Sequence, residues 1–363
     1  GSIRASVFNL CSATLGAGAL SLPYAFRQSG LLTGIVLLWV GGAATQFSIH
    51  LLIKARDVTG ARSYEDLTVQ LMGHRMGYVM EVCVIVFCFG CAVAYIIAVG
   101  DILELTRMPF ILQLLGQKGV ICAFFFLIML PLSLVDSVNA LRFTSFLGVV
   151  SIFYLVFAAC VHASVELSHR SLQEIMRRDD VFFTNASGSL LALPVMIFAY
   201  TCQTNVFSVY HELAQPSPKR MRKVSWRSVA ICFSIYLLMG TAGYLEYGSA
   251  TKPNILQNYM HSTNVGHSIA VQDVLMMFAS VAVVLTVVMA FPLVIFPCRF
   301  TIGVLVFGIK DGKMPTMLHG TVTCVLCLSA LAASMFIPDI STVFGLMGST
   351  ASSFVCFVLP ALL

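Results

Sequence analysis

The feature that most limits the fold is a series of stretches of about 20 mainly apolar residues. Ten such stretches fall near residues 5–28, 31–53, 77–100, 119–135, 143–165, 188–210, 227–247, 271–296, 317–336 and 340–362. This is the length that a helix needs to cross the hydrocarbon core of a bilayer. Because lipid offers no partner to the backbone groups of an open strand, we expect ten membrane-spanning helices. The sequence therefore predicts an all-α, multi-pass protein embedded in a lipid bilayer.

Composition and motifs argue against several classes of protein. Hydrophobic residues make up 58% of the 363 residues and charged residues 10%, against about 25% charged residues in a soluble domain. The net charge is +5 and the basic residues form no patch with interleaved aromatic residues, so we expect no nucleic-acid partner. The sequence has no G-x-S-x-G, H-E-x-x-H or P-loop motif, which argues against an enzyme and against an ATP-driven pump. The twelve cysteines lack the spacing of a zinc site, so packing roles are expected for them, with no metal and no cofactor.

The distribution of basic residues predicts how the chain is oriented. With a cytoplasmic N-terminus, fourteen of the 21 Lys and Arg residues lie on the cytoplasmic side, in agreement with the positive-inside rule. The connection 166–187 then lies outside, and it contains the single glycosylation sequon, Asn185-Ala186-Ser187. We therefore expect a protein glycosylated at Asn185, in the plasma membrane or in a lysosome- or vacuole-like membrane.

Two of the ten stretches are interrupted near their centres. The first, ASVFNLCSATLGAGALSLPYAF at 5–26, contains Gly16, Gly18 and Pro23, which weaken a helix. The sixth contains four polar residues within 201–205. Each interrupted stretch opens a set of five, so the chain reads as two inverted repeats, 1–165 and 188–363, joined by the connection 166–187. Paired interruptions in inverted repeats indicate the binding site of a secondary transporter.

These features also have less specific explanations. Glycines at 16 and 18 would allow close helix packing, and the polar run would supply hydrogen bonds between helices. The ionisable residues of the apolar stretches fall near the ends of those stretches, where an interfacial position accounts for them. They are Glu81, Asp101, Glu104, Glu212, Glu246, Asp273, His50, His162 and His211. The sequence therefore gives no visible proton relay.

Several segments, in order, resemble the amino acid/auxin permease family of the amino acid–polyamine–organocation superfamily. SVFNLCSATLGAGALSLPYAFRQSG at 6–30 is similar to the family's first helix, with Asn, Gly-small-Gly and Leu-Pro-Tyr-Ala in that order. Further similar segments lie at 91–103, 141–157, 198–213, 243–259 and 291–300. The resemblance covers essentially the whole chain.

The resemblance implies a leucine-transporter-type inverted repeat of five plus five transmembrane helices, with the first and sixth helices broken. It also implies an eleventh helix after Leu363, and the lack of an initiator Met suggests a preceding N-terminal tail. By the same resemblance, amides near Gly16 hold the carboxylate of an amino acid, and groups near Thr201 hold its ammonium group. The implied substrate-binding residues are Thr14, Leu15, Gly16, Ala17, Gly18, Phe198, Ala199, Tyr200, Thr201, Cys202 and Asn205.

One departure from the family's pattern concerns the coupling ion. Sodium-coupled members have an Asn where Ser12 stands and a Thr near the position of Val288 or Ala290. Because sodium prefers hard oxygen ligands, the loss of side-chain oxygens weakens such a site. We therefore expect proton coupling or uniport.

The expected function is secondary transport of amino acids by alternating access. An amino acid sensor that binds the solute in the same pocket and transports little is the alternative. A channel is disfavoured because no stretch carries a continuous polar lining. The sequence favours neither neutral nor cationic amino acids as the substrate.

Overall fold

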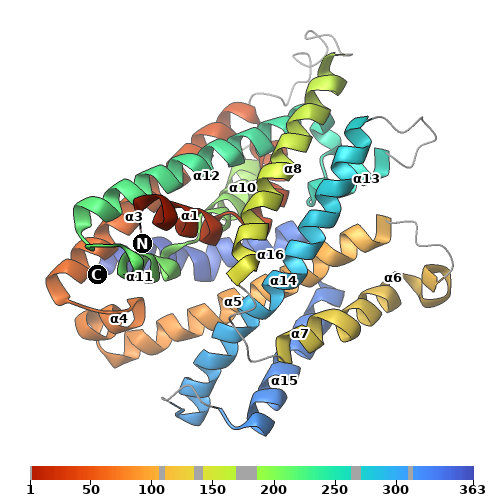
Figure 1. The fold of residues 1–363 in the computed structure, drawn as a ribbon. Helices are drawn as coiled ribbons and strands as arrows, with labels where there is room; N and C mark the ends of the chain where they lie inside the picture. Colours follow the sequence, from red (N-terminus) through yellow and green to blue (C-terminus); the bar gives the residue numbers. More distant parts are fainter. Residues whose placement is uncertain (1, 106–110, 135–141, 169–185, 263–270, 310–313) are drawn as a thin grey trace.

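The computed structural model describes residues 2–105, 111–134, 142–168, 186–262, 271–309 and 314–363, and Figure 1 shows their arrangement. Every regular element in these ranges is helical. The α-helices are α1 Ile3–Thr14, α2 Leu22–Ser29, α3 Leu31–Thr59, α4 Tyr64–Met72, α5 His74–Leu105, α6 Ile111–Phe124, α7 Leu130–Leu134, α8 Arg142–Ser168, α10 Ala186–Ala199, α11 Gln203–Glu212, α12 Pro218–Tyr247, α13 Ile255–Ser262, α14 Val271–Phe307, α15 Thr316–Phe336, α16 Ile340–Met347 and α17 Leu359–Leu362.

Short 3₁₀ and π-helical turns connect some of these helices. The 3₁₀ turns are η1 Ala17–Ser21, between α1 and α2, and η4 Gly248–Ala250, after α12. The π-helical turns are η2 Phe125–Met129, η5 Gly348–Ser352 and η6 Phe354–Val358.

Eight helical segments in the described residues are long and apolar enough to span a membrane, and the bent pair Ile3–Thr14 and Ala17–Ser29 makes a ninth. This confirms the prediction of an all-helical, multi-pass membrane protein. The stretch expected to span at 119–135 is helical, but its apolar helix, Lys118–Leu134, is shorter than a span and ends at the edge of the described residues. A tenth span therefore stays a prediction.

Local sequence signals set several helix ends. The side chains of Ser63, Ser217 and Asp339 accept hydrogen bonds from amides in the first turns of α4, α12 and α16. Pro218 follows Ser217 at the first position of α12, where its missing N–H costs nothing. Gly60 ends α3 with a φ of +72°, a conformation that favours glycine. These local interactions fix where the helices begin and end.

The first helical segment is enclosed by α12 and α10. α14 lies along α5 and α8, α12 lies along α3 and α8, and α10 packs on α2 and α16. Gly240 and Gly243 of α12 let α2 approach closely, because a Cβ at these positions would lie 2.7 Å from Phe26 and 2.8 Å from Pro23. Small residues at helix contacts are how membrane bundles achieve close packing.

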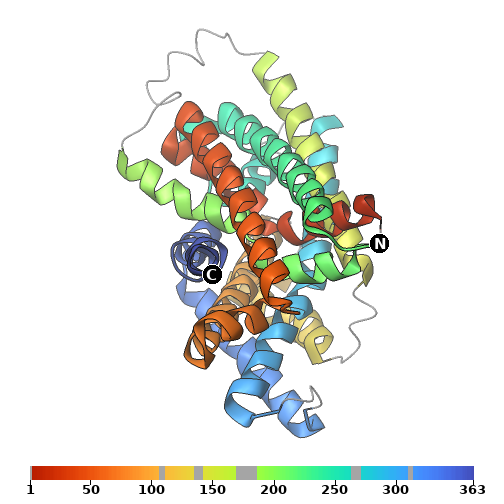
Figure 2. The same cartoon turned by 90° about the vertical axis from the view of Figure 1, so that its left-hand side faces the viewer.

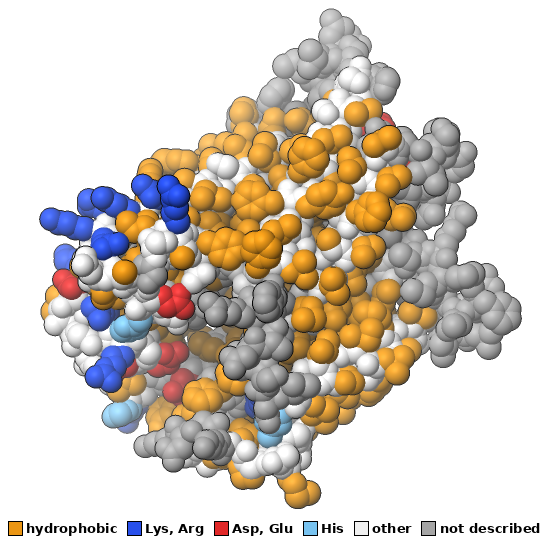
Figure 3. All heavy atoms as spheres, in the orientation of Figure 1, with side chains coloured by type: hydrophobic (Ala, Val, Ile, Leu, Met, Phe, Trp, Pro, Cys, Tyr) orange, Lys and Arg blue, Asp and Glu red, His pale blue; other side chains and the backbone are white. Residues whose placement is uncertain are grey.

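The surface agrees with a protein that lies in lipid. In Figure 3 a continuous hydrophobic surface covers the middle of the molecule over α8, α12 and α14. Exposed large side chains of α8 and α14 include Phe153, Phe157, Phe278 and Val281. Lys and Arg side chains gather at the end of the molecule where both termini lie, although Figure 2 shows the termini on different sides of that end. This concentration of basic side chains at one end fits the predicted cytoplasmic N-terminus.

Candidate functional site

The first helical segment is broken at Gly16. α1 and the segment Ala17–Ser29 meet at an angle of 52°, and Gly16 between them is extended, with φ −139° and ψ −159°. The Leu15 amide donates to the Cys11 carbonyl (2.7 Å), and helical bonding restarts with the Ala19 amide, which donates to the Gly16 carbonyl (3.2 Å). The helical hydrogen-bond ladder therefore skips the amides of residues 16–18, which begin the C-terminal half of the broken helix. Leu15 itself closes the last turn of α1.

The second break lies between α10 and α11, at residues 200–202. The amides of Tyr200 and Thr201 donate to the carbonyls of Ile197 and Phe198 (3.2 and 3.0 Å), which tightens the end of α10. The Cys202 amide is satisfied by the side-chain Oε1 of Gln203 at 2.9 Å. Gln203 is fully buried, so this polar side chain supports the break from inside the bundle.

The structure brings the two breaks into contact. A Cβ added to Gly18 would lie 3.1 Å from the Cα of Ala199, so the helical residues that flank the two breaks touch at this point. The hydroxyl group of Tyr236, on α12, lies 2.7 Å from the Thr14 carbonyl oxygen and 2.7 Å from the Ala199 carbonyl oxygen. Tyr236 is fully buried. Sequence reasoning missed this residue, because a tyrosine within an apolar helix is usually part of the core.

The expected site residues of the first break lie together there. Thr14 is buried, and its hydroxyl donates to the Leu10 carbonyl at 2.7 Å. Leu15, Ala17 and Gly18 are buried, whereas Gly16 is half-buried and a Cβ added to it would meet no atom within 4 Å. An open space therefore lies beside Gly16, as expected where a ligand approaches the backbone.

The expected site residues of the second break point in different directions. The side chain of Tyr200 is buried edge-on against the Tyr236 ring at 5.3 Å, and it packs against Gly41 and Gly42 of α3. Cys202 is buried, whereas Asn205 is exposed on α11, one turn beyond the break. The break therefore offers a ligand the backbone groups of this segment more than its side chains.

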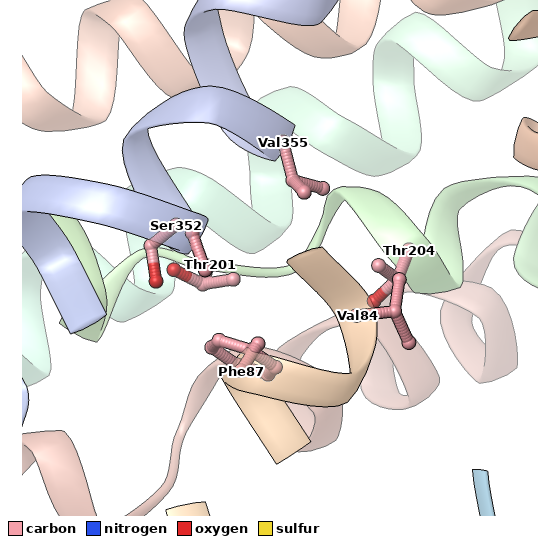
Figure 4. A pocket seen from close by; sticks show the side chains of 7 residues that line it. Val84, Phe87, Thr201, Thr204, Ser352 and Val355 are labelled. Atoms are coloured by element: carbon pink, nitrogen blue, oxygen red, sulfur yellow. The ribbon is translucent and has the colours of Figure 1, made fainter. Parts of the chain in front are cut away.

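A small pocket lies beside the second break, and Figure 4 shows the side chains that line it. Thr201 and Thr204 come from the break and the start of α11, and they face side chains of α5 and of the η5–η6 region. The remaining lining residues are Val84, Phe87, Ala351, Ser352 and Val355. The lining is apolar except for three hydroxyl groups, and none of these side chains is charged.

Three aromatic rings pack together next to the break. The rings of Phe198 and Phe344 are stacked with centroids 4.3 Å apart, and Phe87 lies 5.8 Å from Phe198. They come from α10, α16 and α5, so three helices meet at Phe198. The sequence suggested a site role for Phe198, but the partners Phe87 and Phe344 gave no local signal.

At the positions compared with sodium-coupled transporters, the side-chain oxygens have protein partners. The Ser12 hydroxyl donates to the Ser145 carbonyl of α8 at 3.3 Å. Thr286 donates to Ser151 at 2.9 Å, while Val288 and Ala290 carry no side-chain oxygen. The glycosylation sequon residue Asn185 lies outside the described residues.

The two ends of the bundle are closed by different contacts. At the end with both termini, the Asn9 side chain donates to Glu212 at 2.6 Å, which joins α1 to α11. At the other end, Ser21 donates to the Pro253 carbonyl and Arg27 to the Thr251 carbonyl, both at 2.8 Å. The segment 248–254 is thereby attached to the first broken helix.

Three ionisable residues that were expected at the membrane interface are instead brought together. His162 and Glu246 are 3% and 2% exposed, and the imidazole Nδ1 lies 2.7 Å from Glu246 Oε1. The imidazole Nε2 lies 3.6 Å from Oδ1 of Asp273. They do lie near helix ends, as expected, but burial by α8, α12 and α14 replaces the expected interfacial exposure of His162 and Glu246.

Comparison with known proteins supports a transporter fold. The sialic acid symporter described as Na⁺-coupled matches 99% of this chain and 78% of its own, at 14% identity and a TM-score of 0.60. The match with MhsT in complex with L-phenylalanine covers 98% of this chain and 88% of the MhsT chain, at 11% identity and a TM-score of 0.61. The match with an inward-facing structure of Mhp1 covers 96% of this chain and 75% of the Mhp1 chain, with a TM-score of 0.60. The chain therefore has the leucine-transporter fold.

Sequence relatives carry amino acid transporter names. Amino acid transporter AVT6E of Arabidopsis thaliana is 28% identical over 99% of this chain and 75% of its own length. Vacuolar amino acid transporter 5 of Schizosaccharomyces pombe is 28% identical over 98% and 82%. Sodium-coupled neutral amino acid symporter 2 of Danio rerio is 27% identical over 98% and 73%. The family model "Transmembrane amino acid transporter protein" matches residues 1–363, so the chain belongs to the transmembrane amino acid transporter family.

Proposed function

We propose that this amino acid transporter is a secondary carrier that works by alternating access, driven by protons or acting as a uniporter. The observation that carries the proposal is the contact between the two helix breaks at Gly18 and Ala199. A solute bound between two breaks is held by both halves of the bundle, so its binding is coupled to their relative motion.

The breaks suit the two charged groups of an amino acid. The amides of residues 16–18 begin a helix and carry the positive end of its dipole, which favours a carboxylate. The end of α10 at Ala199 presents carbonyl oxygens and the negative end of a dipole, which favours an ammonium group. The carbonyl of Ala199 already accepts a bond from Tyr236, but a carbonyl oxygen has a second lone pair for a ligand.

A neutral amino acid is the substrate class that the neighbouring side chains favour. The wall formed by Phe87, Phe198 and Phe344 is aromatic, and the adjoining pocket adds threonine and serine hydroxyls without a charge. A lysine or arginine side chain would need a carboxylate there, because an unpaired charge inside a membrane protein is costly.

The choice of coupling ion rests on side-chain oxygens. Val288 and Ala290 offer none, and Ser12 offers a single hydroxyl oxygen, whose hydrogen is donated to the Ser145 carbonyl. A sodium ion would therefore have few hard ligands there. Two relatives are named vacuolar transporters, and one relative and one structural neighbour are named sodium-coupled. We favour proton coupling or uniport in a vacuole- or lysosome-like membrane.

The chain organisation belongs to the same proposal. Residues 1–165 and 188–363 would form the two inverted repeats, the connection 166–187 would lie outside the cytoplasm, and an eleventh helix would follow Leu363. A sensor that binds without transporting remains the second candidate, since binding needs only the broken helices.

The test is transport by the full-length protein in liposomes, with a radiolabelled mixture of the standard amino acids and an imposed proton or sodium gradient. Accumulation with protons alone supports a proton symporter, and exchange of labelled for unlabelled solute without gradient-driven accumulation supports a uniporter. Accumulation that requires sodium contradicts the coupling proposal. Binding without exchange supports the sensor.

A further inference from the structure

A buried acid–base cluster lies away from the helix breaks, between α8, α12 and α14. His162 of α8 stands between two carboxylates, with Nδ1 2.7 Å from Glu246 of α12 and Nε2 3.6 Å from Asp273 of α14. His162 and Glu246 are almost completely buried, whereas the side chain of Asp273 is 18% exposed. The exposed edge of the cluster is therefore at Asp273.

Other titratable groups surround this cluster from every helix packed on it. The Tyr259 ring of α13 lies edge-on to the imidazole at 5.1 Å, and the Tyr247 ring of α12 lies 5.2 Å from Tyr259. Glu166, one turn further along α8, adds a third negative charge at longer range, and Cys160 lies near Tyr259. Asp101 of α5 accepts a hydrogen bond from Asn254 at 3.0 Å.

The charge balance of the cluster favours a bound proton. With a neutral imidazole, the ionised carboxylates of Glu246 and Asp273 would place two negative charges in a region of low dielectric. One added proton makes His162 a cation that faces a carboxylate from each ring nitrogen, and it lowers the net charge to −1. Within the described residues, no group of three or more His, Cys, Asp or Glu side chains could hold a metal ion. The ligand that fits this arrangement is therefore a proton.

The position of the cluster connects it to the closure of one end of the bundle. Tyr247 and Gly248 follow Glu246 directly, and at Gly248 the chain leaves α12 with a φ of +55°. The segment that starts there reaches the first broken helix through the bonds from Ser21 and Arg27, and it reaches α5 through Asn254. A change of charge at Glu246 therefore occurs two residues before the start of the segment 248–254, which covers this end of the bundle.

We propose that His162, Glu246 and Asp273 form the proton-binding site that couples transport to a pH gradient, with access to the proton at the extracytoplasmic end. This inference rests on the proposed function, because it requires that protons drive transport. A proton enters past Asp273 and is shared by His162 and Glu246. Its binding and release change the charge that supports the segment 248–254, and so change whether that end is closed. No bond other than those to the proton is made or broken.

The test compares Glu246→Gln with the wild-type protein in liposomes, using the radiolabelled mixture of the standard amino acids. One proton per solute and one pH unit of gradient give about tenfold accumulation at equilibrium. We expect about tenfold accumulation by the wild type and none by Glu246→Gln, which keeps the shape and one hydrogen bond of the side chain. Exchange of labelled for unlabelled solute without a gradient should stay within about threefold of the wild type, because exchange involves no net transfer of protons.

One matched variant and one control complete the test. His162→Gln should behave as Glu246→Gln, and Glu65→Gln, which removes an exposed carboxylate on α4, should accumulate solute as the wild type does. Tenfold accumulation by both cluster variants overturns the inference and leaves proton-coupled transport intact. A wild-type protein that ignores the proton gradient overturns both.

If Glu246→Gln and His162→Gln also lose exchange, Asp273→Asn decides the matter, because this side chain is partly exposed and its removal disturbs the packing least. We expect Asp273→Asn to exchange solute normally, to accumulate it less than the wild type, and to shift the pH profile of uptake. Wild-type accumulation with an unchanged pH profile would refute the proton site.

Discussion

Gly16 and Gly18 lie in the same helix break, yet the addition of one methyl group is expected to have opposite consequences at the two positions. At Gly16 the new Cβ meets no protein atom within 4 Å, and φ is negative, so alanine fits without strain. At Gly18 the new Cβ lies 3.1 Å from the Cα of Ala199, so the two segments must move apart by a few tenths of an ångström. Gly16→Ala should therefore keep the stability of the protein, and Gly18→Ala should lower it.

The size of each effect follows from the contacts. A carboxylate oxygen bonded to an amide lies about 2.9 Å from the nitrogen, whereas a carbon atom needs about 3.5 Å, so the methyl group at Gly16 enters the ligand's space. Loss of one charge-assisted hydrogen bond costs about 1.5–3 kcal/mol, which raises the apparent KM about 10- to 150-fold. Overpacking at Gly18 should cost about 1–3 kcal/mol of stability. Gly16→Val, with a larger side chain, should abolish transport.

Two assays on the full-length protein separate these effects. Uptake against solute concentration in liposomes gives the apparent KM, and thermal unfolding in detergent micelles gives the stability. Gly16→Ala should change the first and not the second. Wild-type uptake by Gly16→Ala would refute the assignment of the carboxylate site, and a loss of stability as large as that of Gly18→Ala would refute the reading of open space at Gly16.

Three further outcomes are expected elsewhere in the molecule. Tyr236→Phe removes the donor to two buried carbonyl groups, so it should lower the free energy of unfolding by about 1–3 kcal/mol and slow exchange, as measured by thermal unfolding and solute exchange. Gly348→Ala would place a Cβ against the Pro194 carbonyl of α10, so it should reduce the yield of folded protein in size-exclusion chromatography. Asn185→Gln should abolish the gel shift caused by glycosidase treatment if the connection 166–187 lies outside the cytoplasm.

The helix breaks could be predicted from sequence because their causes are local. Gly16 and Pro23 weaken a helix at their own positions, and the polar residues at 201–205 stand out in an apolar run. The structure places unwound backbone at 15–16 and at 200–202, within the expected regions. The positions of the long helices were predictable for the same reason, since the length of an apolar run directly limits what it can span.

The interactions between distant segments could not be predicted. Tyr236 meets both breaks only because α12 packs against α1 and its Tyr236 reaches the last residue of α10, and His162 meets Glu246 only because α8 and α12 lie together. A position near the end of an apolar run suggests an interfacial side chain, but a neighbouring helix buries it. The pattern of a single sequence shows where a residue lies within an apolar run, but it does not show which helix packs against that residue.

The bridge at Tyr236 has a consequence for how the carrier moves. The phenol has one hydrogen and two carbonyl acceptors at equal distances of 2.7 Å, one from each broken helix. It can donate to only one of them at a time, so any motion that separates Thr14 from Ala199 forces it to stay with one partner. The hydroxyl would then change its hydrogen-bond partner during transport, with one carbonyl bonded in the outward-facing state and the other in the inward-facing state.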